Sequence, residues 1–279
     1  MYFISDTFLD SVLSEDIPYG DLTVRLLGID SKSGTLTCWP KADAVICGAE
    51  PAARLFRRLG LEVELSARDG QKLSAGTPFM KVSGPAGAIH ASYKTAQNIM
   101  EYCSGIATRT ARMVEAAARG RRGCRVVTTR KHFPGTKLLS LYAAQCGGAF
   151  MHRAGLSESV LVFDQHRTFC PDFEEALGRL RAADPERKIA VEAASLDEAL
   201  AFARAGADIV QCEKMALEVF AQTVAAVKTL DSRILVSSAG GMNADNAADY
   251  AAAGADFLVT TWPYFGRPAD VKMHIEAAL

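Results

Sequence analysis

From residue 125 onward, short apolar runs alternate with longer stretches in which apolar residues recur at helical spacing. A strand followed by a helix, repeated in this way, is typical of parallel βαβ units. The pattern predicts six strands, at residues 125–129, 159–163, 188–192, 209–213, 234–238 and 257–260. Such a repeat forms either a barrel or an open doubly wound sheet. No G-x-G-x-x-G follows any of these strands, so a dinucleotide-binding sheet has no support.

The segments between the strands carry helix-end signals. Ser195 and Glu198 form a capping box, and Gly206 ends the helix that they start. Another helix is predicted at 137–146, where two glycines follow it.

The first 105 residues have a mixed pattern that predicts an α+β unit. Ser5 caps a first helix that ends before Pro18, and a polar, turn-rich segment follows at 15–23. A long helical stretch at 88–118 is predicted to be interrupted at Gly105. Between them lie four strand candidates and one helix, at 35–39, 44–47, 61–65, 79–82 and 51–59. We therefore expect two domains, at 1–105 and 106–279, with a last helix that packs back on the first domain.

Composition excludes several classes of protein. With 279 residues the chain can bury a sizeable core, and a formal net charge of −1 gives no global field to attract nucleic acid or an anionic membrane. The basic run at 119–125 reads as a solvated helix end. The seven cysteines include no C-x-x-C, which argues against a disulfide framework or zinc site and favours small core residues in a reducing compartment. Asp6 and Asp10 stand where a secretion signal would be basic, and no segment is long enough to span a membrane, so we expect a cytoplasmic protein.

The carboxyl ends of the predicted strands are where a parallel barrel places its chemistry. Each of these ends is polar or glycine-rich. One such residue is ordinary at a surface, but their joint placement predicts a site. The residues are Arg130 and Lys131; Asp164, Gln165 and His166; Glu192; Glu213 and Lys214; Ser238, Gly240 and Gly241; and Thr260 and Thr261.

Four cationic or titratable residues bracket the strand-helix unit at 126–153, which predicts an anion site. They are Arg130, Lys131, His152 and Arg153. A multiply charged phosphate or carboxylate needs several fixed donors, and these side chains can neutralise a diphosphate or an acidic co-substrate.

The remaining strand-end residues suit a phosphorylated sugar. Gly240 and Gly241 allow backbone amides to approach a phosphate, and a helix predicted to start near Asn243 adds its positive end. Glu192 and Glu213 can hold ribose hydroxyls, directly or through Mg²⁺. Departure of a diphosphate from a ribose carbon builds positive charge on the sugar and negative charge on the leaving group, and such a site stabilises both.

Five segments together resemble the quinolinate phosphoribosyltransferase family, also called nicotinate-nucleotide pyrophosphorylase, over nearly the whole chain. They are EDIPYGDLT from Glu15, KTAQN with SGIAT from Lys94, TTRKHFPGTKLL from Thr128, CGGAFMHRAGLSESVLV from Cys146 and AGGMNADN from Ala239. The resemblance implies an N-terminal α/β sandwich domain, a C-terminal open or incomplete α/β barrel, and a homodimer or higher homo-oligomer with shared sites.

The resemblance also implies roles for individual residues, with phosphoribosyl diphosphate as co-substrate and Mg²⁺ as cofactor. Lys94 is the cation that the partner's N-terminal domain lends to the site. The catalytic residues are Lys131, Glu192 and Glu213, of which the two glutamates are the candidate Mg²⁺ ligands. Substrate-binding positions are Arg130, His152, Arg153, Phe163 and His166, and phosphate-binding positions are Ser238, Gly240, Gly241 and Thr261.

Departures from the family pattern concentrate in the half that binds the dicarboxylate. Lys94 replaces an arginine and loses its bidentate fork. Phe163 replaces a lysine, and Gln165 an asparagine, so one carboxylate-binding cation is absent. This combination is similar to the divergent molybdenum-transport ModD branch of pyrophosphorylases.

We therefore expect a phosphoribosyltransferase, a pentosyltransferase, that transfers phosphoribosyl to an acceptor other than quinolinate and releases diphosphate. One alternative is a true quinolinate enzyme of NAD biosynthesis that tolerates Phe163. A second, from a different class, is a non-catalytic anion-binding protein connected with molybdate.

Overall fold

The computed structural model describes residues 3–278. These residues form two compact units. The first contains the chain up to residue 111 together with 133–148 and the segment from 263 onward, and the second contains 112–132 and 149–262.

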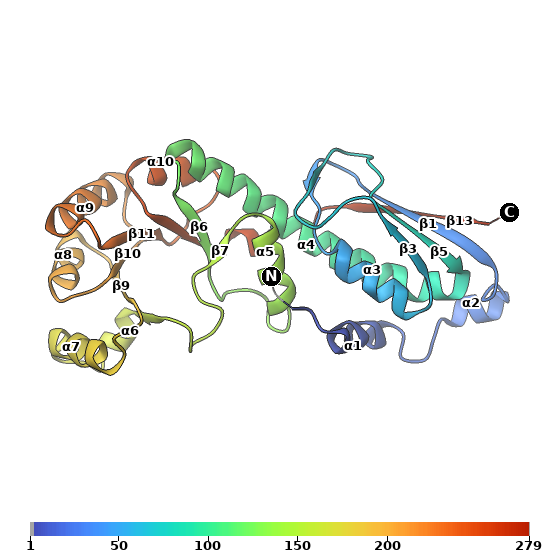
Figure 1. Ribbon diagram of the computed structural model, residues 1–279, viewed down its shortest axis with the longest axis horizontal. Coiled ribbons are helices and arrows are strands. Elements are labelled where there is room, and N and C mark those ends of the chain that lie inside the picture. The colour runs from blue at the N-terminus through green and yellow to red at the C-terminus, as the bar shows by residue number, and fades with distance from the viewer. Residues whose placement is uncertain (1–2, 279) are drawn as a thin grey trace. The chain divides into compact units, whose positions relative to one another are not determined.

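The first unit is built on a four-stranded antiparallel sheet in the order β13-β1-β5-β3 (Figure 1). In β1, alternate residues such as Leu36 and Cys38 are buried, as expected for a strand with one covered face. The helix α3 and the first half of α4 share one hydrophobic core with this face, through residues such as Phe56 and Met100. The elements are β1 (Ser33–Pro40), β3 (Glu62–Leu65), β5 (Met80–Pro85), β13 (Val271–Ala277), α3 (Ala49–Arg58) and α4 (Ala86–Gly120), with a separate pair β2 (Ala44–Val45) and β4 (Lys72–Leu73).

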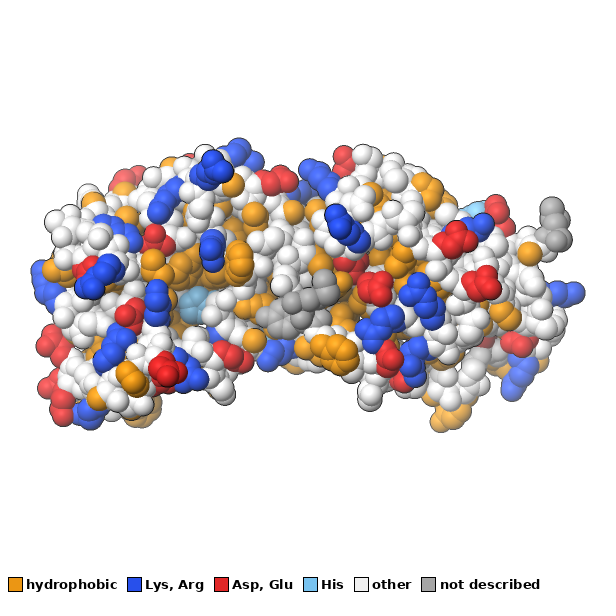
Figure 2. Space-filling model, viewed as in Figure 1, with side chains coloured by type: hydrophobic (Ala, Val, Ile, Leu, Met, Phe, Trp, Pro, Cys, Tyr) orange, Lys and Arg blue, Asp and Glu red, His pale blue; other side chains and the backbone are white. Residues whose placement is uncertain are grey.

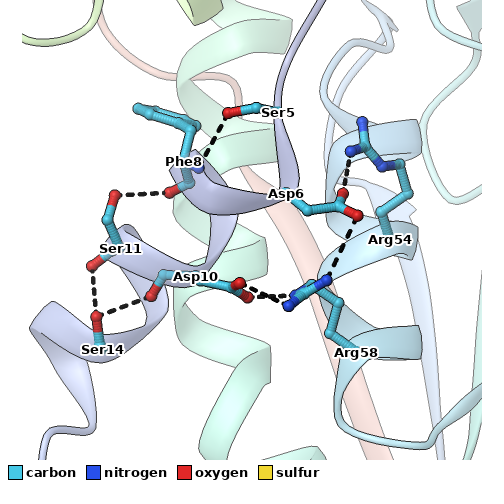
Figure 3. A network of polar contacts seen from close by, with 8 residues as sticks. All are labelled: Ser5, Asp6, Phe8, Asp10, Ser11, Ser14, Arg54 and Arg58. Carbon is cyan, nitrogen blue, oxygen red and sulfur yellow. Dashed lines mark hydrogen bonds and ion pairs between the residues drawn. The ribbon is translucent and has the colours of Figure 1, made fainter.

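The predicted first helix is present as α1 (Asp6–Asp16), and the Ser5 hydroxyl caps it by accepting a hydrogen bond from the Phe8 N–H at 3.2 Å. Figure 3 shows two arginines of α3 facing two aspartates of α1: Arg54 pairs with Asp6, and Arg58 pairs with Asp10 and Asp6. Because these side chains are partly exposed, each pair contributes on the order of 0.2–1 kcal/mol. The pairs orient α1 along α3.

A short helix, α2 (Leu22–Leu27), follows the polar turn and was not expected from its pattern. Its start depends on Asp21, whose carboxylate accepts a hydrogen bond from the Val24 N–H at 3.0 Å.

Two expectations for this unit are wrong. The helix α4 runs without a break through Gly105, where the glycine is needed for space: a Cβ there would lie 2.8 Å from the Arg267 carbonyl oxygen. The last segment is not a helix but the strand β13, which pairs antiparallel with β1. Val271, Met273 and Ile275 pack against the core at a spacing of two residues, which is a strand period.

The second unit is a sheet of seven parallel strands that curls into a half-barrel, in the order β7-β6-β12-β11-β10-β9-β8. The six predicted strands are all present, and the two-residue strand β7 adds a seventh. Their bounds are β6 (Arg125–Thr128), β7 (Phe150–Met151), β8 (Val160–Val162), β9 (Ile189–Ala193), β10 (Ile209–Glu213), β11 (Leu235–Ala239) and β12 (Phe257–Thr260).

Helices connect these strands and lie outside the sheet (Figure 1). They are α6 (Asp164–Arg167), α7 (Phe173–Ala183), α8 (Leu196–Arg204), α9 (Leu217–Leu230) and α10 (Ala247–Ala252). Ser195 caps α8 as predicted, by accepting from the Glu198 N–H at 3.2 Å. The predicted helix at 137–146 is α5 (Lys137–Cys146), which belongs to the first unit. A turn of 3₁₀ helix, η1 (Trp262–Tyr264), precedes the return to that unit.

The remaining global features agree with the composition. All seven cysteines have free thiols, and five of them are buried. None of the described helices is long and apolar enough to cross a membrane. On the face shown in Figure 2, Lys and Arg side chains are interspersed with Asp and Glu rather than gathered into one field.

Two glycine-to-alanine substitutions in helices should have opposite effects on stability. Gly105→Ala places a methyl group against backbone and should destabilise the protein by about 1–3 kcal/mol. Gly178→Ala in α7 meets no atom within 4 Å and should stabilise it by about 0.5–1 kcal/mol. Calorimetric melting temperatures of the two variants measure the difference. A Gly105→Ala protein that melts no lower than the wild type would contradict the close packing.

Candidate active site

A cavity of about 320 Å³ lies at the carboxyl ends of the parallel strands in the second unit. Eleven of the residues singled out in the sequence line it: Arg130, Lys131, His152, Arg153, Phe163, Glu192, Glu213, Lys214, Gly240, Gly241 and Thr261. Five further residues complete the lining: Thr129, Leu161, Gln211, Ala239 and Val259.

Two carboxylates stand on neighbouring strands of this wall. In the parallel register Glu192 of β9 is opposite Gln211 of β10, and Glu213 of β10 is opposite Ala239 of β11. The Gln211 amide nitrogen donates a hydrogen bond to the Glu192 carboxylate at 3.3 Å. Burial raises the pKa of Glu192, and the charge of Glu213 raises it further, while the Gln211 hydrogen bond and the cations Arg167 and Lys131 act in the opposite direction.

Cations face the same cavity. Burial lowers the pKa of His152, and the neighbouring Arg153 lowers it further. Burial also lowers the pKa of Arg153, with a second contribution from Arg130. Both shifts record that positive groups crowd one another in a poorly solvated place. A bound anion would relieve this repulsion, so the cluster formed by Arg130, Lys131, His152 and Arg153 is suited to a phosphate or carboxylate ligand.

An aromatic stack forms the wall next to these cations. The Arg153 guanidinium lies 5.4 Å from the centroid of the Phe163 ring, within cation–π range. The His166 ring stacks on Phe163, with centroids 5.6 Å apart and an interplanar angle of 15°. The His166 Nδ1 also accepts a hydrogen bond from the Phe163 N–H at 3.0 Å. His166 itself does not line the cavity, so it supports the orientation of Phe163.

The turn after β11 forms the third wall. Gly240 and Gly241 both have positive φ, of 83° and 85°. The sequence predicted a helix start near Asn243. The structure differs, because α10 begins at Ala247. Instead, the Asn243 and Asn246 side chains close the turn, and Asn246 donates to the Gly241 carbonyl oxygen at 3.1 Å.

Ser238 and Lys94 also lie away from this cavity, as do Asp164, Gln165 and Thr260. Ser238 is 1% exposed, and because successive side chains of a strand point to opposite faces, it points away from the side on which Ala239 lines the cavity. Lys94 is in the first unit, on α4, where its Nζ donates to the Gln97 amide oxygen at 2.9 Å. That Lys94 contributes to the site of a partner subunit stays a prediction.

Sequence reasoning gave no role to Gln211 and Lys214. Gln211 precedes Glu213 by two residues, so strand alternation alone places both on one face. Lys214 directly follows a strand end, yet its orientation depends on a turn conformation that the residue type does not reveal.

A larger cavity of about 580 Å³ opens at the opposite end of the same strands. Its lining includes Ile209, Leu235 and Phe257, which are apolar and are the first residues of their strands. It contains neither the carboxylate pair nor the glycine turn. Size alone therefore does not identify the site, and the chemistry favours the smaller cavity.

A parallel half-barrel with carboxylates, cations and a glycine turn around one cavity defines an α/β enzyme that acts on an anionic substrate. The family model for the N-terminal domain of quinolinate phosphoribosyl transferase matches residues 21–104. The model for the C-terminal domain of the same family matches residues 106–274. The chain belongs to this family and is a phosphoribosyltransferase.

Individual relatives agree with the family assignment. The chain is 41% identical to the ModD protein of Rhodobacter capsulatus over 250 residues, which cover 89% of this chain and 96% of that protein. It is 32% identical to the carboxylating nicotinate-nucleotide pyrophosphorylase of Mycobacterium leprae over 254 residues, 88% of each chain. The crystal structure of NadC from Streptococcus pyogenes has the same fold, with a TM-score of 0.91 at 23% identity over 100% of both chains.

Replacement of Gln211 by leucine should shift the pH dependence of activity. The amide stabilises the ionised form of Glu192, so Gln211→Leu should raise the pKa of Glu192 above its already raised position. If substrate needs this carboxylate ionised, the acid limb of kcat/KM moves to higher pH. The same substitution at the exposed Gln222, outside the cavity, is the matched control. An unchanged acid limb in Gln211→Leu would show that the ionisation of Glu192 does not set the acid limb of kcat/KM.

Proposed function

We propose that the protein transfers the phosphoribosyl group of phosphoribosyl diphosphate to an aromatic acceptor other than quinolinate and releases diphosphate. The proposal is carried by one observation: Glu192 and Glu213 face a cluster of cations across a single small cavity. Separated charges of this kind match the charge that develops when a diphosphate leaves a ribose carbon.

The carboxylate side of the cavity suits the ribose. Glu192 and Glu213 can accept hydrogen bonds from the ribose hydroxyls, and they stabilise positive charge at the anomeric carbon as the bond to diphosphate breaks. Their mutual repulsion, visible in the raised pKa of Glu192, also makes them suitable ligands for a divalent cation. Mg²⁺ would supply neutralisation of the diphosphate.

The residues present fit that ion only as a shared site. Over residues 3–278 no group of three or more His, Cys, Asp and Glu side chains is arranged to hold a metal ion. Mg²⁺ typically uses one or two carboxylates and completes its shell with water and substrate phosphate oxygens, so two glutamates suffice when the diphosphate is bound.

The part of the cavity lined by Phe163 and Arg153, which follow the edge strands β8 and β7, suits the acceptor. Phe163 presents an aromatic face beside Arg153, so the wall can stack an aromatic ring and pair one carboxylate. A second carboxylate on the acceptor would meet the phenyl ring instead of a cation, which favours an acceptor with fewer charges than quinolinate. The 41% identity to the ModD protein of Rhodobacter capsulatus also supports the proposal. An assembly in which Lys94 of a partner completes the site is part of the same proposal.

The proposal is tested by the release of diphosphate from phosphoribosyl diphosphate, with Mg²⁺ and a panel of aromatic acids. We expect release with at least one monocarboxylate, and loss of that release in Glu192→Gln. If none of the acceptors in the panel supports diphosphate release, the result would count against the proposal. Thermal stabilisation by molybdate but not by phosphoribosyl diphosphate would favour an anion-binding protein instead.

Phe163→Lys should increase activity with quinolinate. A new charge-assisted hydrogen bond is worth about 1.5–3 kcal/mol, so kcat/KM with quinolinate should rise on the order of 10–100-fold. The matched control is Phe169→Lys, which adds the same charge at an exposed position outside the cavity. Full quinolinate activity in the wild type, unchanged by Phe163→Lys, would identify a quinolinate enzyme that tolerates the phenyl ring.

A further inference from the structure

Lys214 is held in an unusual backbone conformation at the mouth of the cavity. Its φ is 53°, which makes it the one residue other than glycine with positive φ in the described part of the chain. A long side chain in this left-handed region is strained, and such strain persists where the surrounding structure fixes it, most often at ligand sites. The Lys214 N–H donates to the Ala239 carbonyl oxygen at 2.8 Å, so the neighbouring strand fixes the conformation.

The glycine turn is shaped around this lysine. A Cβ on Gly240 would lie 2.4 Å from the Lys214 Cγ and 2.8 Å from a Glu213 carboxylate oxygen. The neighbouring Gly241 would meet no atom within 4 Å. The two glycines therefore differ in purpose: Gly240 leaves room for the Lys214 stem, and Gly241 leaves open space over the cavity.

The ammonium group is only loosely engaged. The Lys214 Nζ lies 3.6 Å from a Glu213 carboxylate oxygen, which is an ion pair beyond hydrogen-bonding distance. The Lys214 side chain is 77% exposed, and that of Glu213 is 27% exposed. An exposed ion pair of this kind contributes little free energy to stability and opens readily. Lys214 is thus a cation at the cavity that can change partner without breaking a strong contact.

We propose that Lys214 is a diphosphate-binding residue that exchanges counter-ions: it pairs with Glu213 before the substrate binds and with the diphosphate of the bound substrate. This inference rests on the proposed function and names one more residue for it. Exchange is favoured because a diphosphate carries more charge than one carboxylate and offers several acceptor oxygens. It also frees Glu213 for the ribose hydroxyls at the moment when the sugar arrives.

The strained backbone serves this exchange. It directs the lysine stem past Gly240, along the turn that borders the open space next to Gly241. An extended residue at 214 would direct its side chain away from Gly240 and carry the ammonium elsewhere. The cationic cluster on the other wall and Lys214 would then hold a diphosphate from two sides.

Three substitutions separate the charge of Lys214 from its conformation. Lys214→Asn removes the charge and tolerates the left-handed region, Lys214→Gly removes the charge and the strain, and Lys214→Arg keeps the charge. The control is Arg179→Gln, which removes one exposed cation on α7 outside the cavity. Calorimetric titration of each full-length protein with inorganic diphosphate and with phosphoribosyl diphosphate, in the presence of Mg²⁺, gives the affinities.

We expect the diphosphate Kd to rise about tenfold in Lys214→Asn and Lys214→Gly, and to change little in Lys214→Arg and Arg179→Gln. The melting temperature should rise by roughly 2–4 °C in Lys214→Gly and by less in Lys214→Asn, because strain is relieved fully in the first and partly in the second. Wild-type affinity in Lys214→Asn would overturn the role of Lys214 and leave the proposed function intact. Absence of binding of either ligand to the wild type would overturn both.

Discussion

The parallel register of β9, β10 and β11 is the constraint on which the site depends. It places Glu192 opposite Gln211 and Glu213 opposite Ala239, so that two carboxylates and the glycine turn meet at one edge of the sheet. A slip of one residue in any of these pairings would turn the side chains of that strand to the other face. The carboxylates are held together by the backbone ladder, although their charges repel. Burial raises the pKa of Glu192, and the charge of Glu213, held nearby by that ladder, raises it further.

Opposite charges across the cavity make this arrangement tolerable. Burial lowers the pKa of His152 and that of Arg153, with further contributions from Arg153 and Arg130 respectively, while burial and the charge of Glu213 raise the pKa of Glu192. Each wall alone is unfavourable in a poorly solvated place, and each is stabilised by the field of the other. A substrate that carries a negative diphosphate and a sugar that becomes positive in the transition state relieves the repulsion on both walls. Charges that are frustrated in the free protein are therefore preorganised for the reaction.

The sequence predicted the strands of the half-barrel well because each is an apolar run bounded by polar turns. It missed β7, which has only two residues, and it assigned a helix where β13 alternates with a period of two. Gly105 was interpreted as a helix break because a residue type alone does not distinguish a break from a close contact with the backbone at Arg267. Contacts with distant parts of the chain determine both the strand β13 and the unbroken helix at Gly105. The local sequence pattern carries no information on such contacts.

The same distinction applies to the site. Residues at strand ends converge wherever parallel strands share an edge, so eleven of those singled out line one cavity. Facing direction was the harder part: Ser238 belongs to the right segment but lies on the other face, and His166 acts behind Phe163 rather than in the cavity. The conformation of Lys214 was beyond reach, because lysine carries no signal for positive φ.

The two halves of the cavity are built differently, and this difference bears on how an acceptor can change within one fold. The carboxylates and the glycine turn are part of the strand ladder or directly follow it, so altering them disturbs the register of the sheet. Phe163 and Arg153 follow the edge strands β8 and β7, where each strand has a neighbour on one side only. Substitution there costs little in folding and changes which ring and which charges the wall accepts. A family with this architecture could therefore retain phosphoribosyl transfer while its acceptor diverges. Under the proposed function, Phe163, which stands where the family resemblance implies a lysine, is a change of that kind.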